Sequence, residues 1–228
     1  SIWAAIVLLA VYALCTGSAQ ITPFEALATL AGGGDDYTAM VVLEWRAPRI
    51  LMAVLLGTCL ALSGAIFQNL TGNPLGSPDV IGFQTGSYTG ALVVMLLLGG
   101  GSAATMVGAL TGGVATAFVV FFLSSKRGAV RGVRLIIVGI AVSAMLASVN
   151  VWILLTATVE DAIMAGLWGA GNLSGVSWPT FATAFAGSAL FIVAAAALSR
   201  PMRIMQIGMP FATALGQNVR LVQVSAIV

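Results

Sequence analysis

The most constraining feature of the sequence is a long uncharged run that follows two arginines. The motif Arg46-Ala47-Pro48-Arg49 precedes residues 50–78, which carry no charge, and a turn with two prolines closes the run at Asn73-Pro74-Leu75-Gly76-Ser77-Pro78-Asp79-Val80-Ile81-Gly82. A helix rises 1.5 Å per residue, so a bilayer core of about 30 Å needs roughly 20 apolar residues. The stretch therefore predicts one membrane crossing with a charged start and a proline-marked end.

The rest of the chain is equally apolar. Hydrophobic residues make up 60% of the sequence and charged residues only 7%, whereas soluble domains carry roughly a quarter charged residues. This composition predicts an all-α integral membrane protein, a polytopic helical bundle that forms a single domain over residues 1–228. The first run lacks a basic flank, which favours an anchored helix over a signal peptide. Crossings are predicted at about 2–19, 50–70, 82–98, 103–123, 134–155 and 179–198, and a seventh begins near Val219.

Charge placement predicts the orientation. One basic loop lies between the fourth and fifth crossings, and a second basic segment follows two crossings later, so both lie on one side of the membrane. The positive-inside rule makes that side cytoplasmic. Arg46 and Arg49 then face outside with six of the seven acids, and they are the exception that needs an explanation. The basic residues assigned to the inside are Lys126, Arg127, Arg131, Arg134, Arg200, Arg203 and Arg220.

Several classes of chemistry are excluded by the residue inventory. The chain has no His, a single Lys at position 126, and two cysteines, Cys15 and Cys59, within apolar segments. No metal cluster or nucleophile–base pair can be assembled from these residues. The glycine-rich stretches lack the Lys-Ser or Lys-Thr of a phosphate-binding loop. The sequence predicts no cofactor, no metal and no enzymatic activity, with ATP hydrolysis expected on a separate subunit.

Two short segments outside the crossings have helical signatures. Thr22-Pro23-Phe24-Glu25 is a capping box with proline at the first helical position, which predicts a small external helix over 23–30. Residues 160–169 predict a second external helix, followed by a turn at 171–175. Both are predicted on the outer face.

The motifs together resemble the FecCD-type permeases of binding-protein-dependent ABC importers, which take up iron-siderophores, haem and vitamin B12. The resemblance implies the fold of the vitamin B12 permease, whose family has ten crossings, so that about six to seven are present here and the chain is truncated at its C-terminus. It rests on the order and spacing of Arg46-Ala47-Pro48-Arg49, Leu62-Ser63-Gly64-Ala65 with Gln68, Asn73-Pro74-Leu75 through Gly82, the turn from Gly169 to Trp178, Arg200-Pro201-Met202, and Gly208 through Ala212 to Leu215-Gly216.

The resemblance implies two partner sites. Arg46 and Arg49 would receive glutamates of the soluble substrate-binding protein, a task that suits the planar arginine fork. Alternatively, they reach lipid headgroups or pair with Glu44 or Asp36. Residues 200–218 would be the cytoplasmic segment that couples to the ATPase, although an interfacial amphipathic helix is the alternative and Met209 stands where the family usually has an acid. The coupling residues implied are Gly208, Pro210, Phe211, Ala212, Leu215 and Gly216.

The family's transport path runs between two permease copies. Positions that match its lining or gate are Gln84, Thr85, Ser143 and Asn150. Interhelical hydrogen bonds are the alternative role for each of these polar residues. Small residues at every fourth position, Gly57/Ala61/Ala65 and Gly108/Gly112/Thr116, predict two seams where helices pack together.

The sequence thus predicts a permease subunit of a binding-protein-dependent ABC importer for ferric siderophores. Cobalamin or haem import by the same family is one alternative. A stand-alone secondary carrier or a membrane scaffold would be a different class, and the lack of ionisable residues within the crossings argues against the carrier. The expected partners are an ATP-binding cassette ATPase, an extracytoplasmic binding protein, a second permease copy or paralogue, and lipid, with no nucleic acid. The expected location is the bacterial cytoplasmic membrane, which the chain crosses several times.

Overall fold

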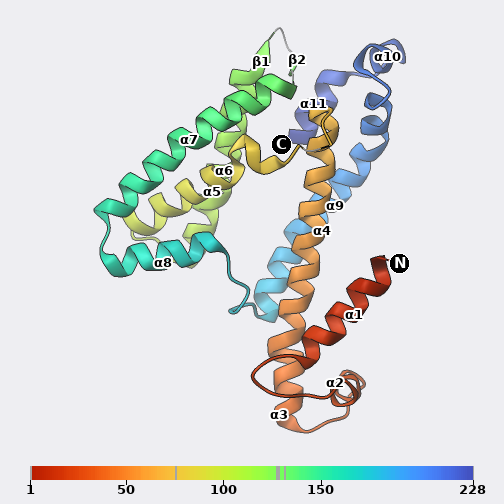
Figure 1. Ribbon diagram of the computed structural model, residues 1–228, viewed down its shortest axis with the longest axis vertical. Helices are drawn as coiled ribbons and strands as arrows, with labels where there is room; N and C mark the ends of the chain where they lie inside the picture. The colour runs from red at the N-terminus through yellow and green to blue at the C-terminus, as the bar shows by residue number, and fades with distance from the viewer. Residues whose placement is uncertain (1, 75, 127–128, 131, 228) are drawn as a thin grey trace. The chain divides into compact units, whose positions relative to one another are not determined.

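The computed structural model describes residues 2–74, 76–126, 129–130 and 132–227, nearly all of them in helices (Figure 1). The contacts divide the chain into two compact units. Unit 1 comprises Ser1–Leu60 and Asn172–Val193, and unit 2 comprises Ala61–Gly171 and Ala194–Val228. Two long helices, α4 (Ala47–Thr71) and α9 (Trp178–Met205), each contribute one part to each unit.

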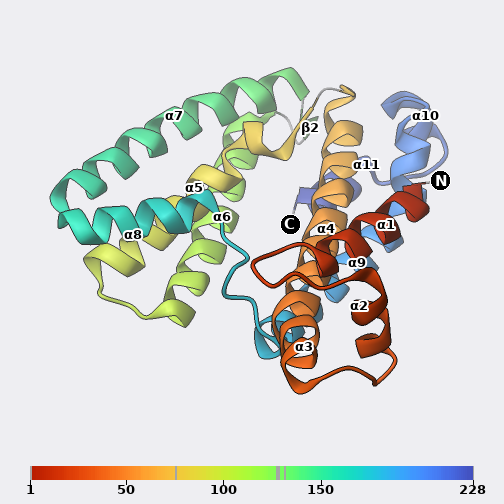
Figure 2. The same ribbon diagram turned by 60° about the horizontal axis from the view of Figure 1, so that its bottom comes forward.

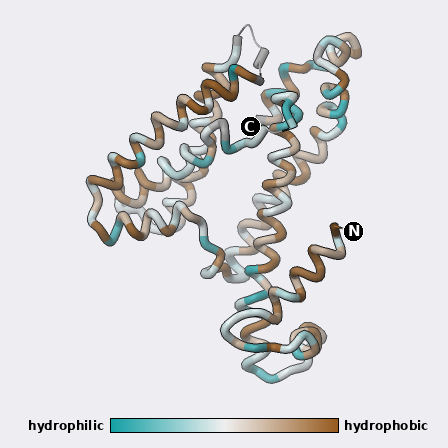
Figure 3. Tube along the Cα trace, viewed as in Figure 1, coloured by the Kyte–Doolittle hydropathy of each residue, from teal (hydrophilic) through white to brown (hydrophobic). Residues whose placement is uncertain are grey.

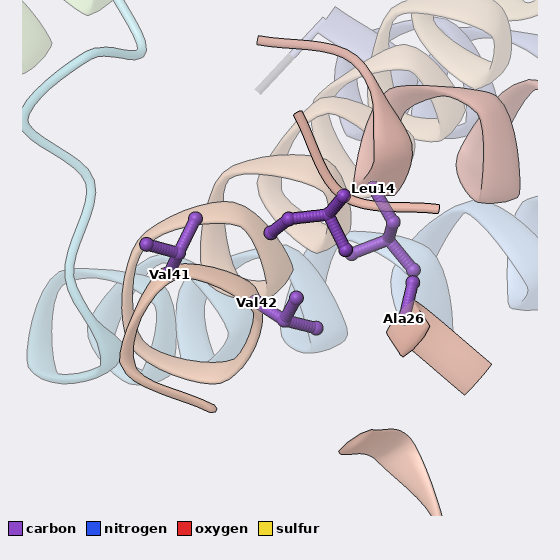
Figure 4. Packing of buried hydrophobic residues seen from close by; sticks show 5 residues of the cluster. Leu14, Ala26, Val41 and Val42 are labelled. Atoms are coloured by element: carbon purple, nitrogen blue, oxygen red, sulfur yellow. The ribbon is translucent and has the colours of Figure 1, made fainter. Parts of the chain in front are cut away.

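Unit 1 contains the N-terminal helices. These are α1 (Ile2–Cys15), α2 (Pro23–Leu30), α3 (Asp36–Ala39) and the π-helical segment η1 (Met40–Arg46), which leads into α4. They pack around a small core of Leu14, Ile21, Ala26, Val41 and Val42 (Figure 4). The start of α2 confirms the predicted capping box, because Thr22 accepts from the Glu25 N–H at 3.3 Å and Glu25 accepts from the Thr22 N–H at 2.8 Å.

The helix that carries Arg46-Ala47-Pro48-Arg49 begins well before the predicted crossing. A continuous helical run extends over Asp36–Thr71, so the motif lies within a helix and not in front of one. Pro48 has no N–H to donate and would ordinarily disturb the helix. Just before it, the backbone shifts to π spacing, and the Ala47 N–H bonds to the Val42 carbonyl five residues back. This local change of spacing lets the helix pass through the proline.

Unit 2 contains a group of helices from the middle of the chain. A 3₁₀ turn, η2 (Pro78–Ile81), leads into α5 (Phe83–Leu92), which continues as the π-helical η3 (Val93–Leu97). Both views show α5, α6, α7 and α8 side by side (Figures 1 and 2). The three further helices of this group are α6 (Ser102–Ser124), α7 (Gly132–Thr156) and α8 (Val159–Ala170).

The predicted basic loop between α6 and α7 is a short hairpin. Its strands β1 (Ser125–Lys126) and β2 (Ala129–Val130) pair antiparallel. Arg134 secures the start of α7 by donating from Nη2 to the Leu123 carbonyl at 2.9 Å. Two of the predicted cytoplasmic arginines, at positions 127 and 131, lie outside the described residues.

The C-terminal part of unit 2 joins the ends of α4 and α9 to two short helices. These are α10 (Met209–Ala214) and α11 (Val219–Ile227). They share a core of Leu70, Met202, Met205, Ala212 and Val222. The α9 helix continues through Pro201 to Met205, beyond the predicted end of the crossing at 198.

The two predicted small-residue seams have different outcomes. The Gly108/Gly112/Thr116 seam is confirmed, because α5 packs directly on it through Gly86 and Gly90. The Gly57/Ala61/Ala65 seam is not occupied by another helix among the described residues, and a Cβ built on Gly57 meets nothing within 4 Å. Both stripes have the same spacing, so spacing alone did not determine which one packs.

Within the described part of the chain, four helical runs are long and apolar enough to span a membrane. They are Asp36–Thr71, Ser102–Ser124, Val133–Thr156 and Trp178–Met205. The predicted crossings at 2–19 and 82–98 are also helices, but they are shorter, at Ile2–Cys15 and Phe83–Leu97. Hydrophobic residues run all along α1 and α7 (Figure 3). Side chains such as Leu155, with 80% of its surface exposed, give these helices apolar outer faces suited to lipid.

Candidate functional site

Arg46 lies in the interior of unit 1. Its guanidinium donates from Nη1 to the Leu14 carbonyl at 2.5 Å and from Nη2 to the Ala19 carbonyl at 2.7 Å. Only 8% of its surface is exposed. Gly17 makes room for it, because a Cβ at that position would lie 2.7 Å from Arg46 Nη2. Arg46 therefore joins the end of α1 and the segment after it to the π turn of η1.

Arg49, one helical turn further, is exposed and faces another part of unit 1. It donates from Nε to the Leu173 carbonyl at 3.1 Å and from Nη2 to the Ser174 carbonyl at 2.8 Å. Trp178 makes a parallel connection from Nε1 to the Leu43 carbonyl at 2.9 Å. Among the described residues, neither Arg46 nor Arg49 pairs with Glu44 or Asp36; both donate to backbone carbonyls.

A pocket of about 750 Å³ opens between these segments of unit 1. Both arginines line it, together with aromatic and hydroxyl-bearing side chains, and none of its described lining residues is acidic. The residues that contribute polar or aromatic groups are Tyr12, Thr16, Ser18, Tyr37, Trp45, Arg46, Arg49 and Ser174.

The predicted path residues lie in unit 2, where α5 meets α7. Asn150 is 5% exposed and donates from Nδ2 to the Thr85 carbonyl at 3.5 Å, while its Oδ1 has no partner among the described residues. Ser143 lies against the start of α5, where a Cβ on Gly82 would be 2.6 Å from its Oγ. Gln84 is exposed. The structure thus brings Thr85 and Asn150 together, whereas the neighbouring Gln84 is exposed.

The predicted coupling residues form a compact turn of helix. Pro210 occupies the first turn of α10, and positive φ values of +123° at Gly208 and +79° at Gly216 mark the two ends of the segment. Ala212 is fully buried in the core shared with α9. Phe211 and Leu215 are 65% and 71% exposed, so α10 presents two large apolar side chains on its open side.

Glutamines attach this segment to the neighbouring helices. The Gln217 N–H closes α10 by bonding to the Ala212 carbonyl at 3.0 Å. Its side chain donates from Nε2 to the Pro201 carbonyl in α9 at 2.8 Å. Gln206, at the end of α9, donates to Asn69 Oδ1 in α4. These bonds and the shared apolar core hold α10 against the ends of α4 and α9.

Comparison with known proteins decides the family. The model of the FecCD transport family matches residues 5–228. The chain belongs to the FecCD transport family. It is 44% identical to the ferric enterobactin transport system permease protein FepG of Escherichia coli K12, over 94% of this chain and 65% of that protein. It is 33% identical to the vitamin B12 import system permease protein BtuC of Pectobacterium atrosepticum, over 76% of this chain and 50% of that protein.

A solved structure shares the fold. It is described as an inward-facing conformation of a metal-chelate type ABC transporter, and it matches with a TM-score of 0.82 and 24% identity over 99% of this chain and 70% of that one. The expected all-helical permease fold is thereby confirmed. The chain spans less than two thirds of the length of the curated FecCD relatives with which it was compared. Family membership and four helices of spanning length make it a multi-pass protein of the bacterial inner membrane.

Several residues of this FecCD chain were not singled out from the sequence. The links made by Gln206 and Gln217 join positions that are distant in the sequence, so no local motif announces them. Tyr12, Tyr37 and Trp45 belong to no common sequence motif, and the pocket brings them together. A signal did exist for Gln206, which is a polar residue between the apolar Met205 and Ile207. The described residues hold no group of three His, Cys, Asp or Glu side chains suited to a metal.

Proposed function

We propose that this chain is the permease subunit of a binding-protein-dependent ABC importer. The observation that carries the proposal is α10, a short helix that packs against neighbouring helices on one side and is exposed on the other. Phe211 and Leu215 project from it with well over half of their surfaces exposed, and large exposed apolar side chains on a short rigid segment suit a protein partner. The partner proposed is the ATP-binding cassette ATPase, which would supply ATP hydrolysis.

The bonds around α10 suggest how its movement would be transmitted. When the ATPase subunits close, they would displace α10, and the Gln217 link to Pro201 would move the end of α9 with it. The Gln206 link would carry the same displacement to α4. Packed elements with discrete arrangements convert small shifts at one end into larger ones elsewhere. In this mechanism Gly208, Pro210, Ala212 and Gly216 shape α10, while Phe211 and Leu215 make the contact.

On the outer side, Arg46 and Arg49 remain the proposed contacts for carboxylates of the binding protein. Arg49 is the better placed of the two, because it is exposed and retains free N–H donors beyond the two bonds it makes. Arg46 is buried, so it would attract the carboxylate through its positive charge without contacting it directly. Arginine suits this role because its planar fork holds a carboxylate in two parallel bonds.

The proposed substrate class is ferric siderophores. The higher identity to the ferric enterobactin permease than to the vitamin B12 permease, 44% against 33%, supports siderophore over cobalamin import. The path would run between two permease copies, with Gln84 and Thr85 at the start of α5 and Ser143 and Asn150 on α7. The bonds of Asn150 and Ser143 also fit simple helix packing, so path lining stays a prediction for these four residues.

The experiment is uptake of labelled substrates by cells carrying the complete operon. The panel comprises ferric siderophores, haem and cobalamin, and wild type is compared with Arg49→Glu and with Phe211→Glu. We expect ATP-dependent accumulation of one ferric siderophore, which both variants abolish. Arg49→Lys is the matched control, because it keeps the positive charge. Gly57→Ala is a second control in α4, the helix of Arg49, and should leave uptake unchanged. Uptake that persists without the binding protein would instead indicate a stand-alone carrier.

A further inference from the structure

The short helix α2 of unit 1 is apolar on the side opposite its packing. Ala26 and Thr29, with 1% and 2% of their surfaces exposed, mark the buried side. Phe24, Leu27 and Leu30 recur at a spacing of three, so they are neighbours on the helix surface and form an apolar face. Their exposed fractions are 82%, 54% and 49%. A helix whose outward side met water would be polar there, so this apolar face indicates an apolar cover.

The position of α2 is set by its packing on α1. Ala26 belongs to the same buried cluster as Leu14, in the last turn of α1, and as Val41 and Val42 of η1 (Figure 4). Residues 1–24 carry no charge, so neither α1 nor the link that follows it contains a group that must remain in water. A helix packed on the last turn of an uncharged crossing lies at the level where the acyl chains meet the headgroups.

Charge distinguishes a lipid cover from a soluble protein. The charged residues nearest to this face in the sequence are Glu25, Asp35 and Asp36, all of them acidic. A binding protein that offers carboxylates to Arg49 would be repelled by these acids. Glu25 turns back along the chain and accepts from the Thr22 N–H at 2.8 Å, which leaves the apolar face without a charge. A lipid surface needs no basic residue here, because apolar side chains bind it through the area that they bury.

We propose that α2 is an interfacial anchor, whose face of Phe24, Leu27 and Leu30 inserts into the lipid leaflet at its end of α1. The partner is the lipid surface itself, bound at the boundary between headgroups and acyl chains. Because Ala26 joins α2 to α1 and η1, the anchor would hold this end of unit 1 at a fixed depth in the membrane. The proposal requires that the chain resides in a membrane, and it does not depend on the importer function.

The test is spin labelling of the full-length permease in phosphatidylcholine nanodiscs. Cys15→Ala and Cys59→Ala remove the native thiols, and a nitroxide is then attached through Phe24→Cys or Leu27→Cys. Oxygen partitions into lipid and a nickel chelate stays in water, so the ratio of the two accessibilities reports insertion of the label. We expect this ratio to be several-fold higher at both positions than at Asp36→Cys, the matched control at an exposed and charged position of α3.

A pair of substitutions determines whether the apolar face itself causes the insertion. With the label at Leu27→Cys, Phe24→Asp should lower the ratio several-fold, because a carboxylate resists transfer from water into an apolar layer. Phe24→Leu keeps an apolar side chain and should leave the ratio nearly unchanged. Neither substitution should unfold α2, since Phe24 is 82% exposed and an acid in the first turn of a helix is favourable.

Four other results would each overturn the proposal. High accessibility to the nickel chelate at both labelled positions would place the apolar face of α2 in water. Low accessibility to both reagents would show that protein covers it: another part of the permease, or the binding protein if the protection arises only when that protein is added. Insertion that occurs only after phosphatidylglycerol is added would show that headgroup charge, and not the apolar face, holds α2. An equal ratio in Phe24→Asp and Phe24→Leu would show that position 24 does not anchor the helix.

Discussion

The α5–α6 pair and the arginine pocket are built on opposite solutions to helix packing. In the pair, a Cβ on Gly90 would lie 2.0 Å from the Gly108 carbonyl oxygen, so the two backbones touch. Around the pocket, Arg46 and Arg49 span the distance between segments with long side chains, and a cavity of about 750 Å³ remains. The glycines allow α5 and α6 to touch along their backbones. The arginines hold their segments apart and line the resulting cavity with N–H donors.

The comparison also shows what a stripe of small residues does. Gly108 and Gly112 are met by Gly86 and Gly90, so both sides of that contact are small. A Cβ on Gly57, the first residue of the other stripe, would meet no described residue within 4 Å. A seam therefore requires a complementary partner, and the stripe permits close approach without dictating it.

The largest expected effect comes from Gly90→Ala. The added methyl group would collide with the backbone of α6, which cannot rotate away as a side chain could, so the two helices must separate. Overpacking costs about 1–3 kcal/mol where side chains can adjust, and we expect a loss at or above the top of that range. Thermal unfolding and gel filtration of the full-length permease would measure it.

The matched control for Gly90→Ala is Gly57→Ala in α4. This change adds the same methyl group to open space, and replacing glycine in a helix gains up to about 1 kcal/mol. A destabilised Gly57→Ala protein would mean that the α4 stripe is a packing seam in the assembled permease. That outcome would remove the difference between the two stripes.

The second effect, of intermediate size, is expected for Arg46→Gln. It leaves the carbonyls of Leu14 and Ala19 without their buried donors, which typically costs about 1–3 kcal/mol. Arg46→Lys should recover part of the loss, because an ammonium can serve one carbonyl but not both in this geometry. Unfolding followed by denaturant titration would separate the three proteins. Equal stability of all three would show that Arg46 does not hold α1 in place.

The sequence predicted the elements of both regions better than their contacts. Hydropathy identified every long helix, because lipid exposure imposes a length and a composition. The capping box at Thr22 identified α2, because a cap is a local signal.

What the sequence missed depended on partners distant in the chain. The motif around Pro48 predicted the start of a crossing, but the π turn before it lets the helix begin at Asp36. Nothing in the motif indicated that Arg46 turns inward to the end of α1 while Arg49 faces the turn at Leu173. Both arginines belong to the same short motif, and the folded backbone distinguishes their partners.

A smaller effect is expected for Trp178→Phe, which tests a second bridge beside the pocket. The change removes the Nε1 donor to the Leu43 carbonyl and keeps an aromatic ring against Phe181. A single neutral hydrogen bond contributes about 0.5–1.5 kcal/mol, and Trp178 is partly exposed, so we expect the lower half of that range. Thermal unfolding would measure the change, and a loss as large as that of Arg46→Gln would show that the tryptophan, and not the arginine, is the principal bridge of unit 1.

The smallest effect is a pH dependence at the start of α2. Hydrogen bonds from the backbone and then the side chain of Thr22 lower the pKa of the Glu25 carboxyl below its ordinary value. A lowered folded-state pKa stabilises the helix start above the unfolded value of about 4.3, and that contribution is lost as the pH falls through the folded-state pKa. Amide hydrogen-exchange protection at the start of α2 should therefore fall in acid, while Glu25→Gln keeps a capping residue without a charge and should show a flat profile. Identical acid profiles in the two proteins would place the sensitivity elsewhere. Because Glu25 is fully exposed, its loss should leave the packing of Ala26 against Leu14 intact, and the effect should stay confined to the first turn.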